Sequence, residues 1–343
     1  MTAADIQAEH EAGKRDDDTR RALDTALRQL EKAKASREEL VAAVYRAAKD
    51  AAQTLTIPPV RVPPRPTGKG SPETAILTLA DWQVGKRTPG YDSDIAAERV
   101  RRYGDLAVRL IRENRAPVDE ARIYLLGDLL EGELIFPGQS HRIDASLYRQ
   151  VFLVSELLSE VVRKVAAVVP QVRVVGVIGN HGEMGGPFRK EYHPESNADA
   201  IAYNIARQHL LNAPNVEWLE TFATNERAWQ AVDEVRGRRW MLWHGNQVKS
   251  ASYGIPWYGF RTRLLGWHSE EPFDYAISGH WHTAVRMQVN RITAWGAGST
   301  ESANTYAKEW LASGGQSPSQ WLLFQGHRGI ASEHLLRLDE VVA

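Results

Sequence analysis

Six short apolar runs, separated by longer amphipathic stretches, constrain what this chain can fold into. The runs cover residues 75 to 80, 122 to 128, 172 to 180, 238 to 245, 273 to 280 and 291 to 298. Runs of this length with few charges are typical of buried strands. Between them, residues 94 to 114, 146 to 168 and 196 to 212 repeat apolar side chains at helical spacing. The alternation predicts a layered α/β sandwich, with central β-sheets flanked by helices.

Five of these runs end in a glycine or a turn that carries a carboxylate, a carboxamide or an imidazole. The residues concerned are Asp81, Gln83, Asp128, Asn180, His181, His244, His280 and His282. Ligands of α/β sheets bind beyond the carboxyl ends of the strands, so we expect these side chains to converge in one crevice. A single Gly-Asp pair is more often a turn with a capping Asp, and therefore the prediction rests on the whole set.

The chain has no cysteine, which excludes disulfides, thiolate zinc sites and a cysteine nucleophile. A metal ion would therefore have to bind His, Asp, Glu, Asn or Gln. Mixed nitrogen and oxygen ligands favour Mn²⁺, Fe²⁺ or Zn²⁺ over Ca²⁺. The 42 Lys and Arg residues nearly balance 43 Asp and Glu residues, so a nucleic-acid partner would need a local basic patch.

Composition divides the chain into three parts. Residues 1–56 have the usage of a solvated helix, 57–72 form a linker rich in proline and glycine, and 73–343 hold all the motifs. Small and apolar residues recur along the helix at alternating steps of three and four. This arm either packs on its own domain or forms a short coiled coil that makes a homodimer or binds a protein partner. The polar N-terminus and the absence of a long apolar run predict a cytoplasmic protein without a membrane span.

The motifs, taken in order, resemble those of the calcineurin-like metallophosphoesterase superfamily: DxH, GDxx(D), GNH(D/E), a strand-end His with Gly, and GHxH. They stand here as Asp81-Trp82-Gln83, Gly127-Asp128-Leu129-Leu130-Glu131, Gly179-Asn180-His181-Gly182-Glu183, His244-Gly245 and Gly279-His280-Trp281-His282. The resemblance covers about residues 75 to 300. It implies the metallophosphoesterase form of the α/β sandwich.

The resemblance also implies two divalent metal ions, with Mn²⁺ expected first and Fe²⁺ or Zn²⁺ as alternatives. The ligands of one ion would be Asp81, Gln83, Asp128 and His282, and those of the other Asp128, Asn180, His244 and His280. Asp128 would bridge the ions, and His181 would be a non-ligating acid beside the scissile phosphate. Two ions about 3.5 to 4 Å apart can bind phosphate oxygens and activate a water. The superfamily usually has His where this chain has Gln83, so either the first ion binds loosely or Gln83 hydrogen-bonds a water instead.

The stretch from Ala80 to Lys86, together with Gly127-Asp128-Leu129-Leu130, is similar to the start of SbcD-type DNA repair nucleases. The first hypothesis is therefore a metal-dependent phosphodiester hydrolase, a nuclease with DNA as its partner. A phosphomonoesterase or protein phosphatase, and a non-catalytic member that binds nucleic acid or a partner, remain open alternatives. The candidate substrate contacts are Lys86, Arg87, Arg189, Lys190, His193, the segment 252–268 and the stacking or core residues Trp82 and Trp281.

Overall fold

The structure, a computed structural model, describes residues 46, 58–68, 70–133, 135, 138–184, 196–219, 229–248, 257–302 and 317–339. The chain divides into two units, Met1–Ala51 and Ala52–Ala343. Apart from Arg46, the predicted arm of residues 1–56 lies outside the described residues, and its role as a dimer or partner contact stays a prediction. Within the second unit, the backbone N–H of Val60 donates to the carbonyl of Asn212 at 3.1 Å, which ties part of the proline-rich segment to the domain.

The described residues of the second unit form a mixed α/β fold. Its strands are β1 (Glu73–Leu79), β2 (Val118–Leu125), β3 (Gln171–Gly176), β4 (Val216–Trp218), β5 (Gln230–Val235), β6 (Arg238–Trp243), β7 (Tyr275–Ser278), β8 (Ala284–Val289), β9 (Ile292–Ser299), β10 (Ser319–Gly326) and β11 (Gly329–Arg337). Its helices are α2 (Ser93–Glu113), the short 3₁₀ helix η1 (Gln139–His141), α3 (Leu147–Ala166), α4 (Ala198–His209) and α5 (Trp257–Glu270).

The strands follow the order β4-β3-β2-β1-β10-β9-β7-β6-β5, with β11 paired to β10 and β8 to β9. Strands β1 to β4 are parallel to one another, and so are β6, β7 and β9. Strand β10 joins the two parallel sets, because it runs antiparallel to β1 and also pairs with the end of β9. Both sets therefore direct their carboxyl ends toward the region where β1, β10 and β9 meet.

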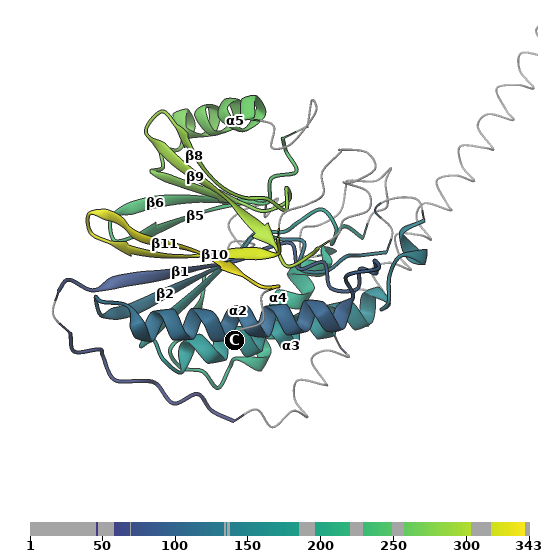
Figure 1. The fold of residues 1–343 in the computed structure, drawn as a ribbon, viewed down its shortest axis with the longest axis horizontal. Coiled ribbons are helices and arrows are strands. Elements are labelled where there is room, and N and C mark those ends of the chain that lie inside the picture. Colours follow the sequence, from purple (N-terminus) through teal and green to yellow (C-terminus); the bar gives the residue numbers. More distant parts are fainter. Residues whose placement is uncertain are drawn as a thin grey trace, which may run out of the picture. The chain divides into compact units, whose positions relative to one another are not determined.

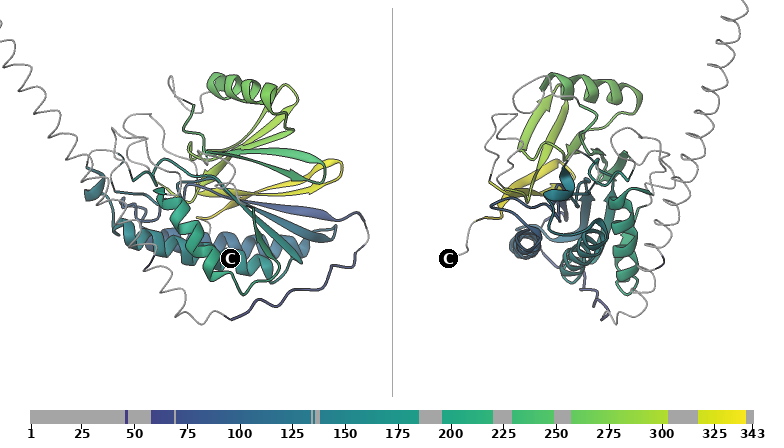
Figure 2. Two further views of the ribbon diagram at one scale, coloured as in Figure 1. Left: turned by 180° about the vertical axis from the view of Figure 1, so that it is seen from behind. Right: turned by 90° about the vertical axis from the view of Figure 1, so that its right-hand side faces the viewer.

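Four layers result. Side chains from both sets, including Ile76, Tyr124, Trp240, Ile277 and Trp295, pack in one buried cluster between them. Helices α2, α3 and α4 lie on the outer side of β1 to β3, with α3 touching both other helices. Helix α5 lies on the opposite outer side and buries its apolar residues against β6 to β8 (Figure 1; Figure 2 gives the view from behind). The predicted layered α/β sandwich is confirmed.

Each of the six apolar runs overlaps a strand, and the three helical stretches overlap α2, α3 and α4. The six runs do not include β4, β5, β8, β10 or β11. Strand β4 has only three residues, and β5, β8 and β11 mix buried with half-buried or exposed residues, so none of these four is a continuous apolar run. Strand β10 is largely buried, but its apolar residues 321–324 are flanked by the polar Ser319, Gln320 and Gln325. No helix in the described part of the chain is both long and apolar enough to cross a bilayer.

Candidate metal centre

All eight side chains predicted from the motifs stand just beyond the carboxyl end of a strand. Asp81 and Gln83 follow β1, Asp128 follows β2, Asn180 and His181 follow β3, His244 follows β6, and His280 and His282 follow β7. Direct contacts link all eight into one cluster. The expected convergence is therefore what the fold produces, although the metal ions themselves remain a proposal.

The backbone of this cluster is unusual. Among the described residues, the non-glycine positions with positive φ are Asp81, Gln83, Asp128, Arg236, His280, His282 and Asn290. Arg236 and Asn290 lie in the tight turns of the β5–β6 and β8–β9 hairpins, where such values are ordinary. The other five belong to the candidate site. Left-handed backbone at such residues costs free energy and concentrates at functional sites, so this strain is an independent indication of function.

Two glycines make room for the carboxylates. A Cβ atom on Gly179 would lie 2.0 Å from Oδ1 of Asp128, and one on Gly279 would lie 2.6 Å from Oδ2 of Asp81. Both carboxylates thus approach the backbone of a neighbouring strand end. Their oxygens accept hydrogen bonds there: Oδ1 of Asp128 from the backbone N–H of His181 at 2.7 Å, and Oδ2 of Asp81 from that of His280 at 2.9 Å.

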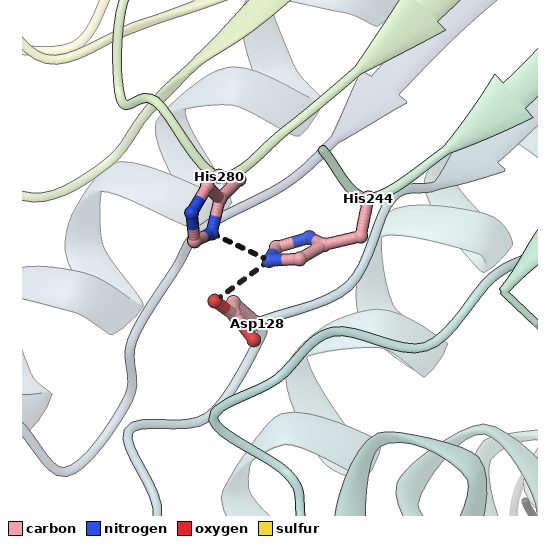
Figure 3. Close-up of side chains that lie close together, drawn as sticks. All are labelled: Asp128, His244 and His280. Carbon is pink, nitrogen blue, oxygen red and sulfur yellow. Dashed lines mark hydrogen bonds and ion pairs between the residues drawn. The ribbon is translucent and has the colours of Figure 1, made fainter. Parts of the chain in front are cut away.

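The centre of the cluster is formed by Asp128, His244 and His280 (Figure 3). Their ligand atoms all lie within 4.8 Å of one another. Nε2 of His244 lies 2.9 Å from Oδ2 of Asp128 and 3.3 Å from Nδ1 of His280. The amide oxygen of Asn180 is 3.2 Å from the same Nε2 atom. Four predicted ligands of one metal ion therefore meet around a single point.

The donor chemistry of this group fits a cation. Nδ1 of His244 lies 2.7 Å from the carbonyl oxygen of Leu126, which can only accept, so the hydrogen of the neutral ring sits on Nδ1. Nε2 then offers a lone pair toward a carboxylate, an amide oxygen and another imidazole. Oδ2 of Asp128 is buried without a well-aligned hydrogen-bond donor. A divalent cation would satisfy these electron pairs together.

The pKa shifts of the central residues also fit a cation-binding site. Burial acts to raise the pKa of Asp128, but the His244 and His181 imidazoles hold it well below its usual range. Burial acts to lower the pKa of His244, yet Asp128 raises it to about 9. Burial, with the charge on His244, lowers the pKa of His280 to about 3. The negative charge of Asp128, which favours a proton on His244, would equally favour a divalent cation at Nε2.

The residues predicted to hold the other metal ion include Asp81, Gln83 and His282, and these three are called the Asp81 half-site. Nε2 of His282 lies 3.4 Å from Oδ1 of Asp81 and 3.0 Å from the amide nitrogen of Gln83. The amide oxygen of Gln83 accepts a hydrogen bond from Nζ of Lys86 at 2.7 Å. An ammonium only donates, so this contact establishes which amide atom is the oxygen. Lys86, a predicted phosphate contact, is therefore directed at Gln83 instead of outward.

His181 lies beside the centre without being part of the group around His244. Its Nδ1 is 2.9 Å from the carbonyl oxygen of Glu131 and 3.3 Å from that residue's Oε2, while Nε2 is 3.9 Å from Oδ2 of Asp128. The hydrogen on Nδ1 leaves Nε2 as the atom facing the centre. Burial acts to lower the pKa of His181, but Asp128 and Glu131 raise it to about 9. A protonated imidazole held in this way can give up a proton as a general acid.

Sequence reasoning missed two buried carboxylates. Asp199, near the start of α4, accepts from the backbone N–H groups of Asp128 and Gly179, each at 2.9 Å. Glu301, beyond β9, contacts Nδ1 of His282 at 2.7 Å and Nζ of Lys86 at 2.6 Å. Neither lies in one of the recognised motifs. The sequence offers one local indication for each carboxylate, its position beside the end of a helix or strand. Asp199 follows Asn197, the N-cap of α4, and Glu301 follows the end of β9.

The tryptophans of the motifs differ in environment. Trp82 is fully buried and belongs to the core. Trp281 is half-buried and stacks edge-on against His280 and Phe260, and its indole nitrogen is buried without a hydrogen-bond partner. The predicted contacts Arg189, Lys190, His193 and residues 252–256 lie outside the described residues.

Comparison by sequence identifies no relatives: no family model matches the chain, and no curated protein does. Solved structures match it with low identity. A predicted phosphoesterase from Streptococcus pneumoniae has 13% identity, covers 78% of this chain and 99% of its own, and superposes with a TM-score of 0.30. A zinc complex of Vps29 from Entamoeba histolytica has 15% identity over 77% of this chain and 97% of its own, with a TM-score of 0.35.

A structure described as an archaeal phosphodiesterase has 9% identity over 77% of this chain and 99% of its own, with a TM-score of 0.33. Similarity at this level carries no argument about activity. The assignment of the site therefore rests on the geometry of its own residues.

Proposed function

We propose that this chain is a metal-dependent phosphoester hydrolase of the calcineurin-like type, and that its substrate is the phosphodiester backbone of DNA. The observation that carries the proposal is the meeting of Asp128, Asn180, His244 and His280 around one point, with His181 beside it. Bound divalent cations supply charge neutralisation for the phosphoryl oxygens and a nucleophilic water near neutral pH.

The chain's own residues have distinct roles in this proposal. Asn180, His244 and His280 would hold one cation, Asp81, Gln83 and His282 would hold the other, and Asp128 would be shared between them. His181 donates the proton on Nε2 to the leaving oxygen, while Glu131 keeps the ring oriented through Nδ1. General acid catalysis of this kind contributes typically about 10²–10⁴-fold to a rate. Mn²⁺ is the expected ion, with Fe²⁺ or Zn²⁺ as alternatives.

Two exposed arginines near the centre, Arg87 and Arg142, support a polymeric substrate. A short antiparallel ladder begins three residues after Gln83: Lys86 pairs with Ile143, and the backbone N–H of Arg87 donates to the carbonyl of Arg142 at 2.8 Å. Arg87 and Arg142 are exposed neighbours. Two guanidinium groups here would contact phosphates flanking the scissile bond, a contact that a small monoester cannot make. This favours a nuclease over a phosphomonoesterase or protein phosphatase.

The test is hydrolysis by the purified full-length chain with Mn²⁺. The substrates are end-labelled linear single- and double-stranded DNA, bis(p-nitrophenyl) phosphate and p-nitrophenyl phosphate. Asp128→Asn is the blank, and Asp105→Asn, an exposed carboxylate paired with Lys164, is the matched control. Cleavage of DNA and of the diester by wild type and control, but not by the blank, is the expected result.

Other outcomes discriminate among the alternatives. Hydrolysis of the monoester alone would replace the nuclease assignment with a phosphomonoesterase or protein phosphatase. No hydrolysis of any substrate, with DNA still bound, would indicate a non-catalytic nucleic-acid-binding member.

A further inference from the structure

We propose that Glu301 is a positioning residue of the candidate metal centre, holding both His282 and Gln83 in place; the inference rests on the proposed function. Glu301 is buried beyond the end of β9. One carboxylate oxygen, Oε2, lies 2.7 Å from Nδ1 of His282. The other, Oε1, lies 2.6 Å from Nζ of Lys86. The Glu301 carboxylate thus contacts His282 directly and, through Lys86, supports Gln83.

The contact with His282 sets the tautomer of the ring. An ionised carboxylate only accepts hydrogen bonds, so Nδ1 of His282 carries the hydrogen and Nε2 of the neutral ring keeps its lone pair. That lone pair faces Asp81 and Gln83: the amide nitrogen of Gln83 lies 3.0 Å from Nε2, and Oδ1 of Asp81 lies 3.4 Å from it. Histidines that bind metal usually donate their second ring nitrogen to such a carboxylate, which fixes the ring and makes it a better ligand.

The contact with Lys86 acts on the residue that departs from the superfamily pattern. Nζ of Lys86 contacts both Oε1 of Glu301 and the amide oxygen of Gln83. Glu301 therefore fixes the position of the ammonium, and the ammonium fixes the orientation of the amide. A neutral amide is a weaker donor than the usual imidazole, and its orientation therefore needs external support. Glu301 also balances the charge of Lys86, which leaves the charge of Asp81 available for a cation.

The backbone around Glu301 is itself anchored to the centre. The hydroxyl of Ser299 donates to the carbonyl of Asp81 at 2.7 Å and accepts from the backbone N–H of Glu301 at 2.9 Å. From α2, Arg99 donates to the carbonyl of Thr300 at 2.7 Å. These bonds fix the position of Glu301 relative to Asp81, as a positioning role requires.

Glu131 offers a matched control inside the same site. It is also buried, and its Oε2 lies 3.3 Å from Nδ1 of His181, which also contacts the backbone carbonyl of Glu131 at 2.9 Å; His181 is not a proposed ligand. Loss of the Glu301 carboxylate should therefore weaken metal binding, whereas loss of the Glu131 carboxylate should slow turnover and leave metal binding unchanged.

The experiment measures Mn²⁺ binding to the full-length chain by titration, with free Mn²⁺ followed by electron paramagnetic resonance. Wild type is compared with Glu301→Ala, the shape-conserving Glu301→Gln and the control Glu131→Gln. Thermal melts in chelator confirm that each variant folds, and Glu301→Gln provides the test if Glu301→Ala does not.

We expect two Mn²⁺ ions per wild-type chain and, without Glu301, a loss of about 10–100-fold in affinity at one site only. The Glu131→Gln chain should bind both ions as wild type does. Affinities within twofold of wild type in the Glu301 variants would overturn the inference alone. A wild-type chain that binds no Mn²⁺ would overturn both the inference and the proposed function.

Discussion

The carboxylate of Asp199 accepts a hydrogen bond from the backbone N–H of Asp128 at 2.9 Å. The same carboxylate accepts from Leu129 at 3.1 Å and from Gly179 at 2.9 Å, so the start of α4 ties together the loops after β2 and β3. Asp199, which lies outside the motif that contains Asp128, therefore supports the strained backbone conformation of Asp128. Burial, with the nearby charge of Asp128, raises the pKa of Asp199 to about 6.

We expect Asp199→Asn to destabilise the protein by about 1–3 kcal/mol, because an amide nitrogen would face buried N–H donors and leave at least one of them unsatisfied. The measurement is urea unfolding in chelator at pH 7. Glu160→Gln, which removes an exposed carboxylate paired with Arg101, is the control and should stay within about 0.5 kcal/mol of wild type. Equal stabilities for wild type and Asp199→Asn would contradict the role given to Asp199.

His181→Ala should retain Mn²⁺ binding and lower the turnover number for bis(p-nitrophenyl) phosphate by about 10²–10⁴-fold, since it removes the proposed acid and no ligand. His280→Ala should lose both Mn²⁺ affinity at one site and activity. His334→Ala, a half-buried histidine of β11, controls for removal of an imidazole elsewhere. Weakened Mn²⁺ binding in His181→Ala would make His181 a ligand and not the acid.

Gly279→Ala should disable the Asp81 half-site, because the new Cβ would lie 2.6 Å from Oδ2 of Asp81. We expect at least about a tenfold loss of Mn²⁺ affinity at one site, similar to the loss of a supporting contact. The control is Gly266→Ala in α5, where no atom outside the adjacent helix backbone lies within 4 Å of the added Cβ. That control should gain about 0.5–1 kcal/mol of stability from helix propensity. Unchanged Mn²⁺ binding in Gly279→Ala would contradict the close approach of Asp81.

Arg87→Ala and Arg142→Ala should each weaken binding of double-stranded DNA and reduce the slope of log affinity against log salt by about one. Hydrolysis of bis(p-nitrophenyl) phosphate, which has no flanking phosphates, should not change. Arg286→Ala, an exposed arginine of β8, is the control. A salt slope identical to that of wild type in both variants would exclude this ladder as the DNA contact.

Six strands, β1, β2, β3, β6, β7 and β9, and the eight predicted site residues could be read from local pattern. Strand β1 begins two residues before its predicted run, and Asp81 follows that run directly. The change from apolar to polar residues marks the end of the strand, because a buried strand is apolar and the turn after it can carry polar residues. Glycine next to Asp128 and next to His280 signals a close backbone approach that is also local in the chain. Such features depend on residues adjacent in sequence, so the sequence determines them by itself.

Only the tertiary structure decided which residues hold those side chains in place. Glu301 reaches His282 and Lys86 because β1, β7 and β9 end at the same region, and Asp199 reaches Asp128 because α4 packs beside β3. The orientation of Gln83 likewise depends on Lys86, whose charged side chain could equally have pointed into solvent. These contacts join residues far apart in the chain, and no periodicity or spacing encodes them, because they arise when packing of the buried layers places strand ends side by side.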